Sequence, residues 1–166
     1  GAEYANYSSD LTRTFPVNGK FTERQKQIYN AVLDMKNFAT SLLVPGNNWY
    51  DYHKECGDFY TSKFLELGLL DKADVQNEDK NWPAYKKYMM HGTSHHMGLD
   101  THDYGILSDK FVENMVFTVE PGIYLPAEGF GIRIEDDVVI QNNGPAFNLM
   151  KNIPIEIEEI EELMNS

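Results

Sequence analysis

The chain has 166 residues, of which 42% are hydrophobic and 13% aromatic, so it can bury a core as one domain and does not belong to the disordered class. Its formal net charge of −12 argues against a nucleic-acid partner, since such binding depends on clustered Lys and Arg. No run of about 18 apolar residues predicts a membrane span. The single cysteine, Cys56, excludes an intrachain disulfide and is expected to be a packed thiol.

The N-terminal residues, GAEYANYSSDLTRTF, include no initiator Met, charged leader or apolar leader. We therefore expect the chain to be a piece of a longer protein, with any targeting signal further upstream. Because no targeting signal is visible, a cytoplasmic location is expected. Residues 2–16 alternate β-favouring and polar side chains, which predicts two short strands that meet near Tyr7–Asp10.

Two helices are predicted next. Thr22 and Gln25 fit a capping box, apolar residues then recur at helical spacing, and PGNN at 45–48 ends the pattern. A second helix is predicted from Trp49 to Leu67, with Gly68 at its C-terminal cap. Both helices should place their apolar faces against a common core.

The second half of the chain is predicted to be mainly β. Residues 71–90 are polar and irregular, which indicates a surface excursion with one helical turn after Pro83. β-Rich segments follow at 115–120, 122–126 and 130–140. The acidic segment 154–166 is typical of a solvated terminal helix or a frayed tail. Helices between an early strand pair and later strands predict an α+β fold with a curved, mostly antiparallel sheet covered by helices.

Four of the five histidines lie between residues 91 and 102, in a segment interrupted by glycines. Imidazoles near carboxylates are typical ligands of divalent ions, and the spacing does not fit a single helical stripe. A hydrolytic site needs a metal to activate water and further imidazoles to stabilise charge on the carbonyl. The other expectation for a single histidine is a structural role, and we expect His53 and His96 to be surface or packing residues.

Three carboxylates each allow two interpretations. Asp10 is either a turn cap or a site residue, because it lies on a polar face near a turn. Glu120 ends an apolar strand before Pro121, where it is either exposed or faces a cleft. Arg133 and Glu135 form either a solvated edge-strand ion pair or a pair that faces an interior polar site.

Taken together, these segments resemble the pita-bread metallopeptidases, in the branch that contains aminopeptidase P (Xaa-Pro aminopeptidase) and prolidase. The resemblance rests on four stretches in the expected order, SSDLTRTFPVNGKFTERQ, HGTSHHMGLDTHD, TVEPGIY and GIRIEDDVVI. It spans nearly the whole chain. The residues around Asp103 and the string GIRIEDD favour this branch over methionine aminopeptidases.

The resemblance implies a centre of two divalent metal ions, usually Mn²⁺, with Zn, Co or Fe as alternatives. Asp10 and Glu135 would bridge the ions, and His95 and Glu120 would complete one of the two sites. The implied reaction is attack of activated water on the carbonyl before proline, with Glu120 moving a proton. Two metals together bind both nucleophile and carbonyl oxygen.

His91, His102 and Arg133 would line the substrate pocket and take part in catalysis, according to the same resemblance. The implied function is a metallo-aminopeptidase that removes the N-terminal residue from peptides with proline in the second position. The acidic chain suits a substrate with a free ammonium terminus. Two alternatives stay open: a prolidase-type dipeptidase, and a binding module that keeps the pocket without catalysis.

The chain departs from the family at its start. The family's first ligand is an aspartate two positions before the glycine that aligns with Gly1. Residues 1–166 are therefore expected to form the C-terminal portion of the catalytic domain, with the first half of the fold and any N-terminal domain absent. We expect at most one firmly bound metal in this piece, impaired activity, and association into a homo-oligomer through exposed sheet edges.

Overall fold

A computed structural model describes all residues, 1–166, and contains four α-helices. Thr22 caps the first helix, and its side chain and that of Gln25 form the predicted capping box. Gly68, at φ 68°, follows the second helix in the left-handed conformation that favours glycine. The helices are α1 (Glu23–Ser41), α2 (Trp49–Glu66), α3 (Lys72–Gln76) and α4 (Ile157–Met164). Both long helices are confirmed to within a residue or two.

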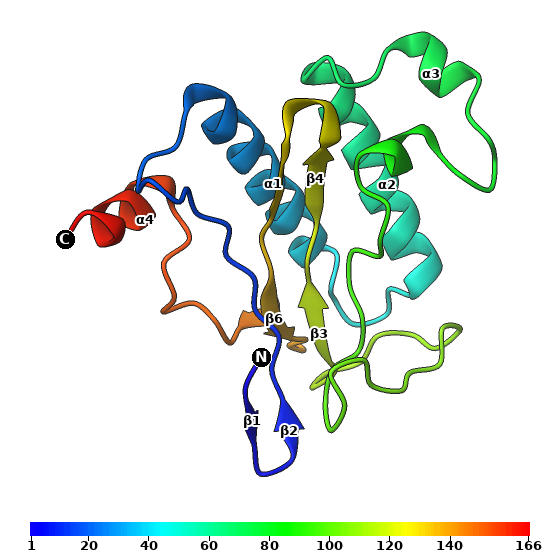
Figure 1. Ribbon diagram of the computed structural model, residues 1–166. Helices are drawn as coiled ribbons and strands as arrows, with labels where there is room; N and C mark the ends of the chain where they lie inside the picture. Colours follow the sequence, from blue (N-terminus) through cyan, green and yellow to red (C-terminus); the bar gives the residue numbers. More distant parts are fainter.

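The strands form three small antiparallel groups. They are β1 (Glu3–Tyr4), β2 (Tyr7–Ser8), β3 (Val116–Val119), β4 (Gly122–Leu125), β5 (Phe130–Arg133), β6 (Asp136–Val139) and β7 (Phe147–Asn148). β1 pairs with β2, β4 pairs with β5, and the order in the largest group is β3-β6-β7. In Figure 1, α1 lies behind the strands and α2 lies beside α1. A cluster of 27 buried hydrophobic residues joins these layers.

The strands β3 to β6 form one long hairpin: β3 and β4 make its first arm, and β5 and β6 make its second. The backbone pairing between the arms is interrupted between the β3–β6 and β4–β5 pairs. The register is Val119↔Asp136 on one side of the gap and Gly122↔Arg133 on the other. These registers are continuous, so Glu120 lies opposite Glu135. Pro121 has no N–H and cannot complete the ladder there. The hairpin therefore presents two facing carboxylates where its backbone pairing is interrupted.

The prediction of one uninterrupted strand over 130–140 is wrong at this gap. The backbone N–H of Glu135 donates to the carbonyl of Thr12 (3.1 Å) instead of to the opposite strand of the hairpin. Thr12 and Glu135 form an isolated antiparallel bridge. The segment after β2 is thereby brought beside the interrupted hairpin.

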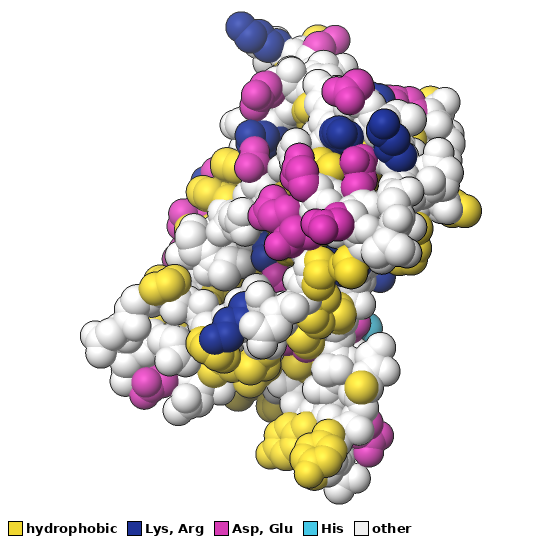
Figure 2. Space-filling view, turned by 90° about the vertical axis from the view of Figure 1, so that its left-hand side faces the viewer, with side chains coloured by type: hydrophobic (Ala, Val, Ile, Leu, Met, Phe, Trp, Pro, Cys, Tyr) yellow, Lys and Arg dark blue, Asp and Glu magenta, His cyan; other side chains and the backbone are white.

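The N-terminal strand pair turns earlier than predicted. Ala5 and Asn6 have φ angles of 51° and 67°, so the turn lies there and not at Tyr7–Asp10. Two successive left-handed residues match the twist of a tight hairpin. This hairpin projects at the lower end of Figure 1, and Tyr4 and Tyr7 on it are 88% and 63% exposed. Figure 2 shows hydrophobic side chains gathered at the same lower end.

Two polar segments are more ordered than predicted. The excursion 71–90 contains α3 as well as the expected helical turn, a 3-10 turn at Ala84–Lys87. The acidic C-terminal segment forms α4, but it is not simply solvated, because Ile157 and Ile160 are buried in the core. Their spacing of three gives α4 one apolar face, and its glutamates lie mostly on the exposed remainder. None of the four helices combines the length and the apolar composition that a membrane span requires.

Candidate metal centre

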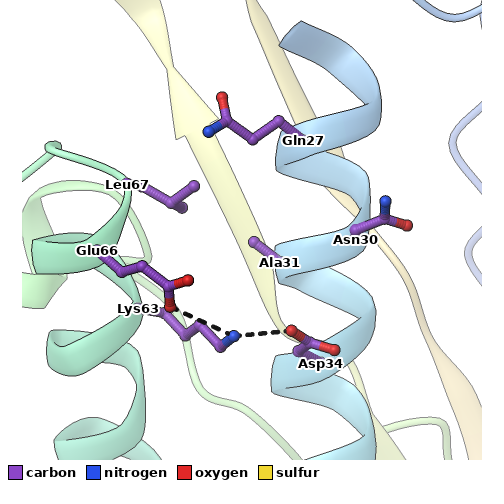
Figure 3. A pocket seen from close by; sticks show the side chains of 7 residues that line it. All are labelled: Gln27, Asn30, Ala31, Asp34, Lys63, Glu66 and Leu67. Atoms are coloured by element: carbon purple, nitrogen blue, oxygen red, sulfur yellow. Dashed lines mark hydrogen bonds and ion pairs between the residues drawn. The ribbon is translucent and has the colours of Figure 1, made fainter. Parts of the chain in front are cut away.

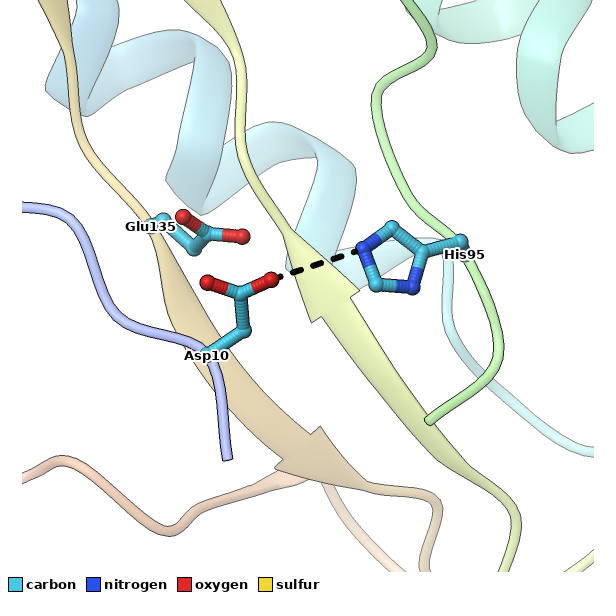
Figure 4. A group of neighbouring side chains, drawn as sticks. All are labelled: Asp10, His95 and Glu135. Carbon is cyan, nitrogen blue, oxygen red and sulfur yellow. Dashed lines mark ion pairs between the residues drawn. The ribbon is translucent and has the colours of Figure 1, made fainter. Parts of the chain in front are cut away.

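The structure brings together the four residues that the resemblance implies as ligands. One ligand atom from each of Asp10, His95 and Glu135 lies within 4.8 Å of the others (Figure 4). His95 Nε2 lies 3.8 Å from Asp10 Oδ2 and 3.5 Å from Glu120 Oε1. Asp10 lies in the segment after β2, and His95 lies in the loop before β3. Glu120 directly follows β3, and Glu135 directly precedes β6. Their role as ligands stays a prediction.

The two facing glutamate carboxylates repel one another at a site that is largely buried from solvent. The side chains of Glu120 and Glu135 are 17% and 2% exposed. Burial, with a further contribution from Glu135, raises the pKa of Glu120 to about 7. Burial also raises the pKa of Glu135. Like charges opposite each other across a strand pair are destabilising, so this arrangement favours either a proton or a cation between them.

His95 is held with its Nε2 facing the carboxylates. Its Nδ1 lies 2.9 Å from the carbonyl of His96. Since a carbonyl only accepts, Nδ1 carries the proton and Nε2 presents a lone pair. The backbone N–H of His95 donates to Thr118 Oγ1 (3.1 Å), and that of Thr118 donates to the carbonyl of His95 (3.1 Å). This geometry fixes the tautomer that a metal ligand requires.

Unpartnered acceptors test whether these residues suit a cation. His95 Nε2, Glu135 Oε1 and Asp137 Oδ1 are buried without a hydrogen-bond partner. Two of these three atoms belong to the candidate ligands, and neither accepts a hydrogen bond. Buried acceptors without partners are costly, and a divalent ion would satisfy them. The donor set therefore fits a divalent metal, and imidazole together with carboxylates is compatible with Mn²⁺, Fe²⁺, Co²⁺ or Zn²⁺.

Hydrogen bonds hold the remaining carboxylate oxygens. Thr12 Oγ1 donates to Glu135 Oε2 (2.5 Å), and the backbone N–H of Asp10 donates to Asp137 Oδ2 (3.0 Å). Burial raises the pKa of Asp137 to about 7. Asp137 is thus a buried carboxyl behind the site that sequence analysis had not assigned a role. The strand pattern of GIRIEDD, with Glu135 and Asp137 on one face, was the available signal.

The Arg133–Glu135 pair is neither fully solvated nor fully buried. Arg133 Nε lies 3.9 Å from Glu135 Oε2, and the side chains are 43% and 2% exposed. Arg133 Nε also donates to Thr12 Oγ1 (3.0 Å). The carboxylate therefore faces the interior, and the guanidinium lies at its rim.

The predicted pocket residues lie around this centre. The ring of His102 stands edge-on to that of His95 with 4.3 Å between centroids, and its side chain is exposed. His91 Nδ1 donates to the Gly92 carbonyl (2.8 Å), so its Nε2 accepts from the hydroxyl of Tyr124 (2.7 Å). Burial lowers the pKa of His91 and thus favours this neutral form.

Tyr124 was not among the predicted site residues. Its side chain lies over Gly131, where an added Cβ would meet Tyr124 Cδ1 at 2.7 Å. Glycine at the paired position of β5 is therefore needed for the ring to lie across the strand pair and reach His91. The aromatic residue opposite a glycine was the only signal in the sequence. His53 and His96, by contrast, pack against Trp49 with centroid distances of 5.3 and 5.4 Å, as expected for packing residues.

A separate surface pocket lies between the long helices. Its lining side chains come from α1 and from the end of α2 and the residue after it (Figure 3). Lys63 Nζ there pairs with Asp34 Oδ2 (2.8 Å) and Glu66 Oε2 (3.6 Å). None of the candidate site residues lines it, and its one lysine already pairs with both of its carboxylates.

The raised pKa of Glu120 predicts how the metal-free protein responds to pH. A group that gains protons on folding stabilises the protein below its unfolded pKa, and this stability is lost as pH rises through its folded pKa. For Glu120 that window runs from 4.5 to about 7. With chelator present, the melting temperature of Glu120→Gln should exceed that of wild type, and this difference should grow between about pH 5 and pH 8. A pH-independent difference would contradict this.

The comparisons agree with the resemblance. Residues 1–142 match the sequence model of metallopeptidase family M24. The chain is 42% identical over 177 residues to the Xaa-Pro aminopeptidase of Haemophilus influenzae, covering 99% of this chain and 40% of that protein. It is 35% identical over 174 residues to Xaa-Pro aminopeptidase 3 of Homo sapiens, covering 98% of this chain and 34% of the relative.

Solved structures show the same likeness. Zn-substituted Escherichia coli aminopeptidase P in complex with product superposes with a TM-score of 0.85 at 39% identity, covering 98% of this chain and 39% of that one. The same enzyme with the inhibitor Pro-Leu gives the same TM-score of 0.85 and the same coverage. These likenesses confirm the predicted pita-bread architecture of mixed helices and antiparallel sheet, which is not closed in this chain. The chain spans about two fifths of the length of the bacterial relative described above.

Proposed function

Because this chain belongs to metallopeptidase family M24, we propose that the protein containing it is a metal-dependent aminopeptidase that removes the N-terminal residue from peptides with proline second. The observation that carries the proposal is the convergence of Asp10, His95, Glu120 and Glu135, with unpartnered acceptor atoms on His95 and Glu135. The names of the relatives supply the substrate class.

In the proposed site, the carboxylates of Asp10 and Glu135 would hold both divalent ions, and His95 and Glu120 would add ligands to one of them. The ions would supply Lewis-acid activation of water and of the substrate carbonyl at neutral pH. Glu120 Oε1 lies 3.5 Å from His95 Nε2, at the same point, and its carboxylate is proposed to accept and return a proton during the reaction. Manganese is the ion we propose for the native protein.

The neighbouring side chains are proposed to hold the substrate. His102 is exposed beside His95, where its imidazole would stabilise negative charge developing on the peptide carbonyl oxygen. The hydroxyl of Tyr124 donates to His91 and favours the neutral form of its imidazole. This arrangement gives the pocket a cationic wall near Arg133 and an acidic floor that attracts a free ammonium terminus.

The decisive experiment uses the intact protein that contains this chain, loaded with Mn²⁺, and two matched tripeptides that differ only in Pro or Ala at the second position. We expect release of the first residue from the proline peptide alone. His95→Ala, which removes one proposed ligand, should lose both bound metal and turnover. Cleavage of dipeptides only would indicate a prolidase-type enzyme, and metal binding without cleavage of any Xaa-Pro bond would indicate a binding module.

Four finer expectations belong to this proposal. Residues 1–166 would form the C-terminal portion of the catalytic domain, and this portion alone would be impaired. The whole protein would associate into a homo-oligomer, for which the exposed tyrosines of the β1–β2 hairpin are a candidate contact. A cytoplasmic location stays a prediction.

A further inference from the structure

Arg13 makes an unusually complete set of contacts for a residue outside the proposed chemistry. Its side chain is 11% exposed. Its Nε donates to the carbonyl of Pro154 (2.8 Å), and Nη1 donates to the carbonyls of Thr12 (3.0 Å) and Glu135 (2.8 Å). Nη2 donates to Asp136 Oδ1 (2.7 Å). The guanidinium thus binds backbone on both segments that carry the proposed bridging carboxylates.

Asp136 connects Arg13 to the rest of the fold. This carboxylate is 1% exposed, and its Oδ2 accepts from the Lys36 ammonium on α1 and from Asn148 Nδ2 on β7 (2.8 Å). Although burial raises the pKa of Asp136, the Lys36 ammonium and the Arg13 guanidinium hold it below its usual value. A buried carboxylate with two cations and one amide is fully partnered. Arg13 is therefore fixed at a junction of α1, β6 and β7.

The backbone alone does little to set the register beside the interrupted hairpin. Between residues 10–14 and 133–137 there is one backbone hydrogen bond, from Glu135 N to Thr12 O. Side chains supply the other contacts, among them Thr14 Oγ1, which donates to the carbonyl of Arg133 (2.9 Å). A single backbone bond permits rotation and slippage, so the alignment of Asp10 with Glu135 depends on side chains such as Arg13.

We propose that Arg13 is a positioning residue of the metal centre: its guanidinium clamps the backbones of Thr12 and Glu135 so that the carboxylates of Asp10 and Glu135 face the same ion. This role rests on the proposed metal centre. Lysine in its place keeps the charge but loses the planar fork, because an ammonium cannot reach four acceptors in these directions. Outer partners of metal ligands typically contribute about 10- to 100-fold in metal affinity.

The test is calorimetric titration of metal-free intact protein with Mn²⁺. Arg13→Lys should bind about 10- to 100-fold more weakly than wild type. The matched control is Arg24→Lys, because Arg24 also pairs through two nitrogens with a distant carboxylate, Glu128 (2.6 and 2.9 Å), away from the site. The control should bind as wild type does. Metal-free melting temperatures are recorded alongside, since a merely structural role would lower them without changing the dissociation constant of the folded protein.

The outcomes separate this proposal from the one on which it rests. Wild type that binds no Mn²⁺ would overturn the metal centre and the role of Arg13 with it. Wild-type binding with equal affinity in Arg13→Lys would overturn only the positioning role. Should Arg13→Lys not fold, Asp136→Asn decides, because it removes the charge that holds Arg13 Nη2 and leaves the guanidinium and its backbone acceptors in place. A severalfold weaker affinity supports the proposal, and an unchanged affinity overturns it.

Discussion

Titration of the isolated 166-residue chain with Mn²⁺ is expected to reveal no more than one tightly bound ion per chain. The chain offers Asp10, His95, Glu120 and Glu135, and Mn²⁺ favours octahedral coordination. Two ions that share Asp10 and Glu135 would leave the second with these shared carboxylates alone. Turnover of an Xaa-Pro peptide should fall on the order of 10²-fold or more below that of the intact protein, since the reacting groups are incompletely oriented.

Stoichiometry from calorimetry and turnover of the same sample check this expectation. His95→Ala in the isolated chain is the control, and it should abolish the one remaining site because Nε2 of His95 lies between Asp10 and Glu120. Two tight sites per chain with full turnover would contradict it. That result would mean that another copy of the chain contributes a donor.

Replacement of His102 by alanine in the intact protein is expected to lower kcat on the order of 10²- to 10³-fold, with metal content unchanged. The His102 ring touches His95 edge-on but has no carboxylate partner among the described contacts. It is therefore placed to donate to charge that develops during the reaction rather than to bind the ion. Turnover kinetics and metal analysis of the same preparation measure the two effects separately.

The matched control for this variant is His53→Ala. His53 belongs to the same residue type and stacks on Trp49 at 5.3 Å, without contact to the proposed ligands. Its replacement should leave kcat within a fewfold of wild type. Equal loss of metal and activity in His102→Ala would make His102 a ligand, and unchanged kcat would remove it from the reaction.

Much of the fold was predictable because local rules were obeyed. The capping box of Thr22 and Gln25 and the glycine at position 68 set the ends of the helices by backbone geometry that the sequence states directly. The convergence of the candidate ligands followed from a resemblance that spans distant motifs, and not from periodicity. No local rule brings Asp10 beside Glu135.

The features that were missed depend on tertiary contacts. The break after Arg133 arises because Glu135 turns its N–H to Thr12, a partner more than a hundred positions away. The Ser-Ser-Asp sequence at residues 8–10 is as typical of a turn as Ala5–Asn6 is. The turn nevertheless forms at Ala5–Asn6, and Ser8 belongs to β2. Burial of α4 was hidden by its many glutamates, since the two isoleucines that anchor it occupy a narrow face. Side-chain bridges such as Arg13 to Asp136 leave no periodic signal at all.

The candidate ligands of the metal centre differ in how far apart they lie in the sequence. Glu120 and Glu135 meet within a single hairpin, whereas Asp10 lies more than a hundred positions before either of them in the sequence. An ion held by all three would act as a cross-link that closes a loop comprising most of the chain. Closing a long loop removes more conformational freedom from the unfolded ensemble than closing a short one. Metal loading should thus stabilise the attachment of the N-terminal segment much more than the hairpin itself, much as a well-placed disulfide would.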